Sequence, residues 1–364
     1  MVAFSAVFAS EIGPHAVRGG ILRIVEQADF RSLDPAIAYD LESIPVTRLL
    51  FRGLLEYDNG VHLVPGQASD WNISPDGKTY TFHLKPGIKF ANGREVEAED
   101  YVFSFERILN PATDSPGQGF FTDIEGAPEF VAGKTNHVSG LSAPDKRTLV
   151  IRLHKPLYTF RYVLAMTFAS VEPRDVVEQY GKEFQNHLIG SGPYEMAEWR
   201  RGVRWRIIRN PYYTGPDGYV DGLDIRIVAD ASTGTMMLER NETDRVKPSP
   251  AEAIMFARDP RRHSWLVGVP TVGTDYIFMN TEMKPFDNVL VRQAMNYAIN
   301  KVRINGLTGG FTTIADGIVP PQMSWTNAGL PHYDYDSERA RALLRQAGYP
   351  NGIKTTLAYE ADNT

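Results

Sequence analysis

Apolar and polar residues follow two clear periods between residues 65 and 111. At residues 79–84 the apolar side chains of Tyr80, Phe82 and Leu84 fall at every second position, which predicts a β-strand with one buried face. From Ala98 the period becomes 3.6, which predicts an amphipathic helix. The apolar face of that helix consists of Tyr101, Val102, Phe105, Ile108 and Leu109.

Shorter patterns predict the remaining elements. Alternation predicts strands at residues 20–25, 148–153, 199–209, 223–227, 274–280 and 355–359, and Val203, Trp205 and Ile207 share one face of the third. Helical spacing predicts helices at residues 43–55, 291–302 and 337–347, the last capped by Asp336 and followed by Gly348. Residues 113–140 are rich in glycine, proline and aspartate, so we expect loops there.

Length and composition narrow the class of protein. The chain has 364 residues, enough for two or three domains, with 43% hydrophobic and 23% charged residues, as in ordinary globular proteins. Its net charge of −6 offers no basic surface for nucleic acid. It has no cysteine, which excludes disulfides and thiolate chemistry. No apolar run is long enough to span a membrane.

The first ten residues are apolar and rich in small side chains, but they lack the positive charges that begin a signal peptide. Two interpretations stay open for residues 1–18. They are either the remnant of a signal sequence, with Val7-Phe8-Ala9 at the cleavage end, or a disordered tail.

No catalytic or metal-binding motif is complete. Ser191 lacks the first glycine of a nucleophile elbow, and Gly117-x-Gly119 lacks the third glycine of a dinucleotide loop. The histidines are scattered, and Arg339 stands where a calcium loop that began at Asp334 would need glycine. We therefore expect no catalytic residues, no metal and no cofactor. The chain is predicted to bind a ligand and not to be an enzyme.

The motifs of residues 65–111 stand in an order that resembles the family 5 extracytoplasmic solute-binding proteins, the peptide, dipeptide and nickel receptors of ABC importers. The matching residues are Pro65, Ala68, Trp71, Ser74, Asp76, Gly77, Tyr80, Thr81, Phe82, Leu84, Gly87, Lys89, Phe90, Asn92, Gly93, Ala98, Asp100, Phe103 and Ser104. Glu97 departs from the family's usual threonine, which we expect to alter the helix cap.

Further family motifs follow in the same order, so the resemblance covers about residues 20–360. They are Gly53-Leu54 with Asp58, Gly192-Pro193-Tyr194, Asn210-Pro211-x-Tyr213, Val291-Arg292-x-Ala294 and Ala347-Gly348-Tyr349-Pro350-x-Gly352. Members of the family continue beyond this length. The resemblance therefore implies a C-terminally truncated chain.

The resemblance implies an α/β fold like that of type II periplasmic binding proteins, with two lobes of mixed sheets, an extra α+β subdomain and an incomplete second lobe. Residues 19–60 and 186–273 would form lobe I, and residues 61–185 the subdomain beside it. Residues 274–280 would be the hinge, and residues 281–364 would begin lobe II.

The implied function is capture of oligopeptides or dipeptides by closure of the two lobes, followed by delivery to ABC permease subunits of the inner membrane. Such a protein is expected to be a monomer in the periplasm, or outside the cell and tethered to the membrane if it is a lipoprotein. Receptors of the same fold for nickel chelates, haem, oligosaccharides or opines are the alternative. A non-transporting remnant and a hydrolase are alternatives of other classes.

Candidate ligand contacts also come from the resemblance. Tyr39, Asp40 and Leu41 lie in a segment that borders the cleft in peptide receptors, where their backbone groups would pair with a peptide. Gly117 stands where relatives place an aromatic residue, and Phe120 is expected to compensate. Tyr276 and Phe278 alternate along the expected hinge strand. Two roles stay open for these two rings, contact with the ligand or buried hinge packing.

Overall fold

The computed structural model describes residues 18–58, 62–216, 218–268, 273–321, 323 and 329–358. Several sequence predictions fall partly outside these ranges: the N-terminal tail to residue 17, the domain boundary at residues 59–61, residues 269–272 before the expected hinge, and the end of the last expected strand. The chain forms two compact units, Met1–Pro248 and Ser249–Thr364, which are described separately.

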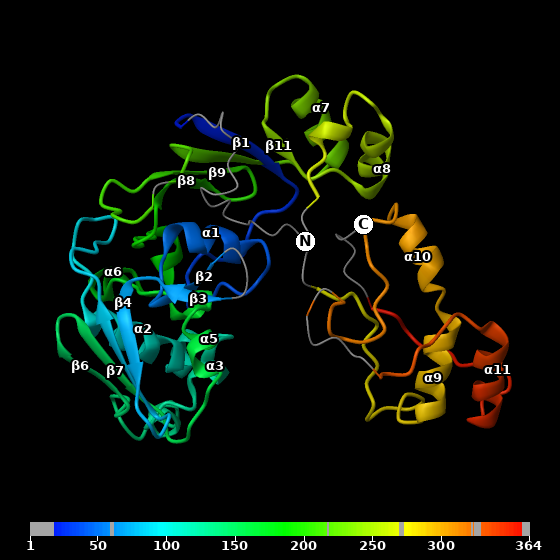
Figure 1. Cartoon of the computed structure of the whole chain (residues 1–364), viewed down its shortest axis with the longest axis horizontal. Helices are drawn as coiled ribbons and strands as arrows, with labels where there is room; N and C mark the ends of the chain where they lie inside the picture. Colours follow the sequence, from blue (N-terminus) through cyan, green and yellow to red (C-terminus); the bar gives the residue numbers. More distant parts are fainter. Residues whose placement is uncertain are drawn as a thin grey trace. The chain divides into compact units, whose positions relative to one another are not determined.

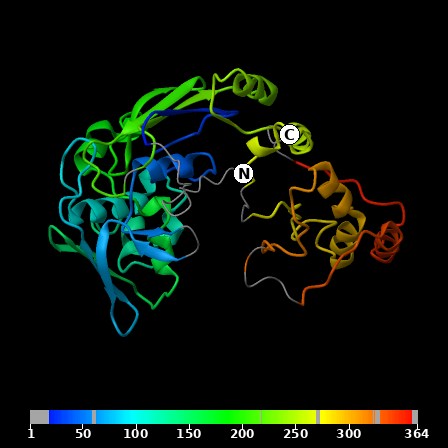
Figure 2. The ribbon, with the colours of Figure 1, turned by 45° about the horizontal axis from the view of Figure 1, so that its top comes forward.

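A mixed five-stranded sheet forms one layer of the first unit. Its order is β11 (Arg245–Val246), β1 (Ile21–Glu26), β10 (Gly222–Ile227), β9 (Arg204–Arg209) and β8 (Tyr194–Arg200). Strand β1 runs parallel to both neighbours, whereas β8, β9 and β10 are antiparallel. Ile24, Trp205 and Ile225 of the sheet form a buried cluster with Val46 and Leu50 of α1 (Ser43–Leu50). Both views place α1 between this sheet and the rest of the unit (Figures 1 and 2).

The second layer of this unit is an antiparallel sheet covered by one long helix. Strands β4 (Ala68–Ile73), β5 (Thr79–Leu84), β7 (Thr148–Arg152) and β6 (Leu141–Asp145) pair in that order, and α2 (Ala98–Leu109) packs on them (Figure 1). A smaller sheet joins β2 (Leu55–Tyr57) to β3 (Leu63–Pro65). All three alternating side chains of β5 and all five of the predicted helical face are buried. The pattern of residues 65–111 therefore predicted this layer correctly.

The N-terminus of α2 is capped by reciprocal hydrogen bonds between side chains and backbone. Glu97 and Asp100 form a capping box, and Asp100 Oδ2 accepts a hydrogen bond from the Glu97 backbone N–H at 2.9 Å. A carboxylate in the first turn also faces the positive end of the helix dipole. The departure at Glu97 therefore changes the type of cap without removing it.

Residues 113–140, expected to be loops, contain short helices. These are α3 (Gln118–Phe121) and α4 (Ala127–Val131), after the 3₁₀ turn η1 (Pro111–Thr113). Further short helices in this unit are α5 (Phe160–Val163), η2 (Thr167–Ala169), α6 (Arg174–Tyr180), η3 (Gly181–Asn186) and α7 (Ala231–Glu239). One helical turn is too short to produce a readable period, so the loop prediction missed these helices, while most of the remaining segment is irregular as predicted.

Two boundaries in the first unit also differ from the prediction. Helix α1 ends at Leu50 and not at residue 55, because Gly53 bridges to Ser170 and the following residues form β2. The strand expected at residues 199–209 is a hairpin of β8 and β9. Gly202, with φ +67°, lies in its turn and leaves Val203 55% exposed.

The second unit is helical where it is regular. It contains α8 (Pro250–Arg258), η4 (His263–Trp265), α9 (Val289–Ala298), α10 (Lys301–Leu307) and α11 (Ser337–Gln346). Helix α9 packs on α11. As predicted, Asp336 caps α11 through the backbone N–H groups of Glu338 and Arg339, and Gly348 follows with φ +90°. No helix within the described ranges is long and apolar enough to cross a membrane.

Three predictions in the second unit were wrong. The helix expected at residues 291–302 breaks at Ile299, because Asn300 caps a new helix by accepting from the Arg303 N–H at 2.9 Å. Val302 is consequently exposed. Residues 273–280 and 353–358 contain no strand, although their alternation predicted two. A strand exists only where a neighbour pairs with its backbone, and alternation carries no information about that neighbour.

Candidate functional site

A buried cluster of three charges lies in the first unit, next to the turn that leads to Tyr39. Arg107 of α2 donates from Nη1 to Asp34 Oδ1 and to both carboxylate oxygens of Glu172, each at 2.7 Å. All three side chains are largely enclosed. One guanidinium therefore serves two carboxylates that come from different segments of the chain.

Sharing one arginine has electrostatic consequences for the group. Burial of Glu172, opposed by Arg107 and reinforced by Asp34, raises the pKa of Glu172 to about 8. Burial alone would lower the pKa of Arg107, but the carboxylates of Glu172 and Asp34 raise it. Arg107 is thus permanently charged, whereas Glu172 takes up a proton far more readily than an exposed glutamate.

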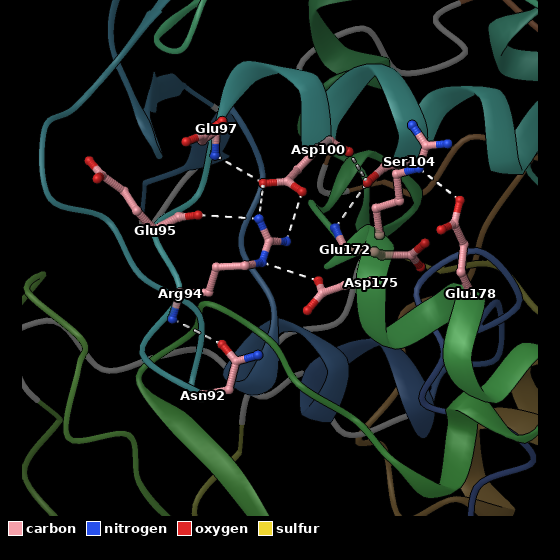
Figure 3. A network of polar contacts seen from close by, with 10 residues as sticks. Asn92, Arg94, Glu95, Glu97, Asp100, Ser104, Glu172, Asp175 and Glu178 are labelled. Atoms are coloured by element: carbon pink, nitrogen blue, oxygen red, sulfur yellow. Dashed lines mark hydrogen bonds and ion pairs between the residues drawn. The ribbon is translucent and has the colours of Figure 1, made fainter.

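Polar contacts continue from Glu172 to the start of α2 (Figure 3). The Glu172 N–H donates to Ser104 Oγ at 2.9 Å, and Ser104 Oγ donates to the Asp100 carbonyl at 2.7 Å. The Asp100 carboxylate accepts two hydrogen bonds from Arg94, whose Nε lies 3.1 Å from Asp175 Oδ1. These contacts fix α2 and α6 against each other.

The same cluster fixes the segment that carries Tyr39. Asp34 Oδ1 accepts from the Ala36 N–H at 3.0 Å, and the Asp34 carbonyl accepts from the N–H groups of residues 37 and 38. On the far side, the two oxygens of Asp40 accept from Ser43 N and Ser43 Oγ, each at 2.7 Å. Tyr39 is therefore held between two hydrogen-bonded turns.

Three aromatic rings meet beside this segment. The Tyr39 ring stacks on Phe168 with centroids 5.5 Å apart and planes at 25°. The Phe120 ring lies 6.2 Å from the same Phe168 ring, with planes at 31°. Tyr39 is 57% exposed and Phe120 is 39% exposed, whereas Phe168 is 2% exposed. We call Tyr39 and Phe120 resting on Phe168 the aromatic platform.

Gly117 is required for this packing. A Cβ at residue 117 would lie 2.6–2.8 Å from three atoms of the Phe168 ring, closer than real contacts allow. Its loop is anchored by Ser115 Oγ, which accepts from the Gly117 N–H and donates to the Ala36 carbonyl at 2.5 Å. The structure thus brings the predicted residues Tyr39, Gly117 and Phe120 together.

Sequence reasoning missed Phe168, the ring at the centre of the platform. Residues 167–169 form a single 3₁₀ turn, so no period marks which side chain is buried. Only the long-range contacts with Tyr39 and Phe120 identify its place.

The other predicted site residues are also exposed. Leu41 in the first unit is 51% exposed, and Tyr276 and Phe278 in the second unit are 64% and 81% exposed. The ligand-contact role of these two rings stays a prediction. Among the described residues, no three His, Asp or Glu side chains gather in a way that would hold a metal ion.

Comparison with known families gives one match over most of the chain. The profile described as "Bacterial extracellular solute-binding proteins, family 5 Middle" matches residues 62–364. The glutathione-binding protein GsiB of Escherichia coli O1:K1 / APEC is 32% identical over 332 residues, an alignment that covers 91% of this chain and 62% of GsiB. GsiB of Salmonella paratyphi A gives the same identity and the same coverage. This chain thus spans 62% of the length of these curated relatives.

Solved structures give similar matches. The periplasmic binding protein DppA of Helicobacter pylori, in complex with the peptide STSA, has a TM-score of 0.77 at 28% identity and covers 93% of this chain and 68% of its own. The murein tripeptide binding protein MppA of Escherichia coli has a TM-score of 0.78 at 27% identity, with 91% and 67% covered. Haemophilus influenzae OppA, in complex with RPPGFSPFR, has a TM-score of 0.76 at 25% identity, with 91% and 67% covered.

Proposed function

The chain belongs to the bacterial extracellular solute-binding proteins of family 5, and from this membership we propose that it captures peptides outside the cytoplasm for an ABC importer. The predicted resemblance and the predicted α/β fold with mixed sheets are confirmed at the level of the family and the fold. Family membership also agrees with a protein that binds a solute and does not transform it.

The observation that carries the proposal is the exposed Tyr39 segment, fixed on both sides by hydrogen bonds. A peptide offers backbone donors and acceptors whatever its side chains are, so a rigid, exposed segment suits general peptide capture. Two solved relatives are in complex with peptides, STSA and RPPGFSPFR. These complexes support a peptide as the ligand of this chain.

The mechanism that we propose is closure of two lobes around the ligand. In this proposal the first lobe consists of residues 19–60 and 186–273, and the subdomain beside it consists of residues 61–185. Residues 274–280 act as the hinge, and the second lobe begins at residue 281. Tyr276 and Phe278 contribute apolar surface to the ligand from the hinge segment. The partners are the permease subunits in the inner membrane, and the protein works as a monomer.

Glutathione is the second candidate ligand. The identity of 32% to GsiB, over 91% of this chain, favours it. Glutathione is itself a short peptide, so both candidates use the same fold and the same transport step. They differ in the side chains that the site must accept.

Native mass spectrometry after incubation with a peptide pool that includes glutathione tests the proposal. We expect complexes of the chain with one peptide, and we expect that peptide to be recovered intact. An Arg174→Ala variant serves as a control and should retain the same peptide as the wild type, because it removes only one side of an exposed ion pair with Glu178. Absence of any retained peptide, or cleavage of the pool by pure protein over time, would contradict the proposal.

A further inference from the structure

The aromatic platform offers two exposed rings on one buried ring, and we propose that it is a subsite for an aromatic side chain of the bound peptide. This inference rests on the proposed function, because it names the ligand that the same site prefers. Phe168 is the positioning residue of the subsite, and Tyr39 and Phe120 are the side chains that touch the ligand.

The spacing of the rings suits a further aromatic group. Aromatic pairs are favourable when their centroids lie about 4.5–7 Å apart in offset-stacked or tilted geometry. Tyr39 and Phe120 both fall within this range of Phe168. Tyr39 is stacked on the buried ring at 25°, Phe120 is tilted to it at 31°, and both are partly exposed, so a ligand ring in contact with either extends the aromatic cluster.

Close packing and a hydrogen bond hold the parts of the platform together. Phe168 is enclosed, and the absence of a side chain at Gly117 lets its ring lie directly against that backbone. The hydrogen bond from Ser115 to Ala36 joins the loop of Phe120 to the segment of Tyr39. A site that is already ordered loses less entropy on binding, so more of the free energy of the apolar contact contributes to affinity.

The carboxylate beside the platform is already in use. Both oxygens of Asp40, the carboxylate next to Tyr39, accept hydrogen bonds from Ser43. Glutathione carries carboxylates and an ammonium group but no ring, so its charges gain little from this surface. A peptide with phenylalanine, tyrosine or tryptophan matches the surface directly. The chemistry therefore points to aromatic peptides over glutathione.

Calorimetric titration of the purified chain with three probes tests this preference. The probes are the tripeptides Ala-Phe-Ala and Ala-Ala-Ala, and glutathione. We expect Ala-Phe-Ala to bind about tenfold more tightly than either of the others, which corresponds to the gain from one additional aromatic contact. Equal affinity for all three probes, or tighter binding of glutathione, would overturn the inference while peptide capture itself would stand.

Variants separate direct contact from a general loss of structure. Tyr39→Ala and Phe120→Ala should each reduce the preference for Ala-Phe-Ala over Ala-Ala-Ala severalfold, and Tyr39→Phe should restore it because the ring remains. Phe168→Leu should reduce the same ratio, since it keeps part of the apolar volume but removes the ring that supports the stack. A purely structural role would weaken both tripeptides equally and leave their ratio unchanged.

Tyr212 provides the matched control. Its exposure of 41% is close to that of Phe120, but it lies against Gly93. Tyr212→Ala should leave the ratio of affinities at the wild-type value. If the ratio survives in Tyr39→Ala and in Phe120→Ala, the subsite lies elsewhere and the inference is wrong. If no peptide of the pool and none of the three probes binds the wild-type chain, both the inference and the proposed function are wrong.

Discussion

At the scale of single residues, the aromatic platform depends on the absence of a side chain at Gly117. Gly117 occupies a position where relatives were expected to carry an aromatic side chain. In this chain the ring of Phe168 fills the space that a side chain at residue 117 would need. The aromatic surface is thus supplied by Tyr39 and Phe120, which rest on Phe168.

Gly117→Ala should destabilise the protein. The added Cβ would meet the Phe168 ring at 2.6–2.8 Å, so the ring or the loop must move, at a cost of about 1–3 kcal/mol. Urea unfolding followed by circular dichroism measures the loss. Gly119→Ala is the matched control, because nothing lies within 4 Å of a Cβ there, and it should change the free energy of unfolding by less than about 0.5 kcal/mol. Equal stability of the two variants would show that the loop yields freely.

Glu172 should make stability depend on pH. Its pKa is raised from 4.5 to about 8 in the folded chain, so the folded state holds a proton that the unfolded state has lost. The stabilising contribution is complete below pH 4.5 and is lost as the pH rises through about 8. Relative to Glu172→Gln, the wild-type melting temperature should therefore fall between these two pH values.

Thermal melts at a series of pH values test this dependence. Glu178→Gln is the control, since Glu178 forms an exposed pair with Arg174, and its profile should run parallel to that of the wild type. A wild-type melting temperature that keeps a constant offset from Glu172→Gln across the series would show that Glu172 does not titrate in this range.

At the scale of elements, the sequence predicted what local periodicity determines. The strand β5 and the helix α2 were correct because their apolar positions repeat over whole elements and meet in one core. The α9 boundary failed because a side-chain cap at Asn300 interrupted an apolar pattern that continued to Val302. Of the aromatic platform, Tyr39 and Phe120 were candidates from motif order, whereas Phe168 depends on contacts between distant segments.

Arg107→Ala should be the most damaging polar substitution at the scale of elements. It leaves Asp34 and Glu172 buried without their shared partner, and it releases α2 from the turn before Tyr39, at a cost of about 3–5 kcal/mol. Arg174→Ala, which breaks an exposed pair, should cost less than about 1 kcal/mol. Urea unfolding compares the two, and equal losses would contradict the structural role given to the buried cluster.

At the scale of the whole molecule, burial is distributed unevenly between the two compact units. Both large apolar clusters belong to the first unit. In the second unit, the buried apolar side chains among the described residues are Phe256, Val291, Ala294 and Ala340. Since apolar burial is the main stabilising term, the second unit should open more easily than the first.

Amide hydrogen exchange should reveal this difference. Peptides from α9 and α11 should exchange faster than peptides from β5 and α2, because their helical hydrogen bonds are protected by fewer buried side chains. Equal protection of α9, α11, β5 and α2 would mean that the two units unfold together.

The central claim is that a peptide is captured on the aromatic platform of the first unit. Hydroxyl-radical footprinting, with and without a saturating peptide taken from the binding pool, tests it most directly, because tyrosine and phenylalanine rings are oxidised according to their exposure. We predict that the peptide slows oxidation of Tyr39 and Phe120, both exposed in the free chain, and leaves Tyr212 unchanged. Unchanged oxidation of Tyr39 and Phe120 while the peptide is bound would contradict the claim.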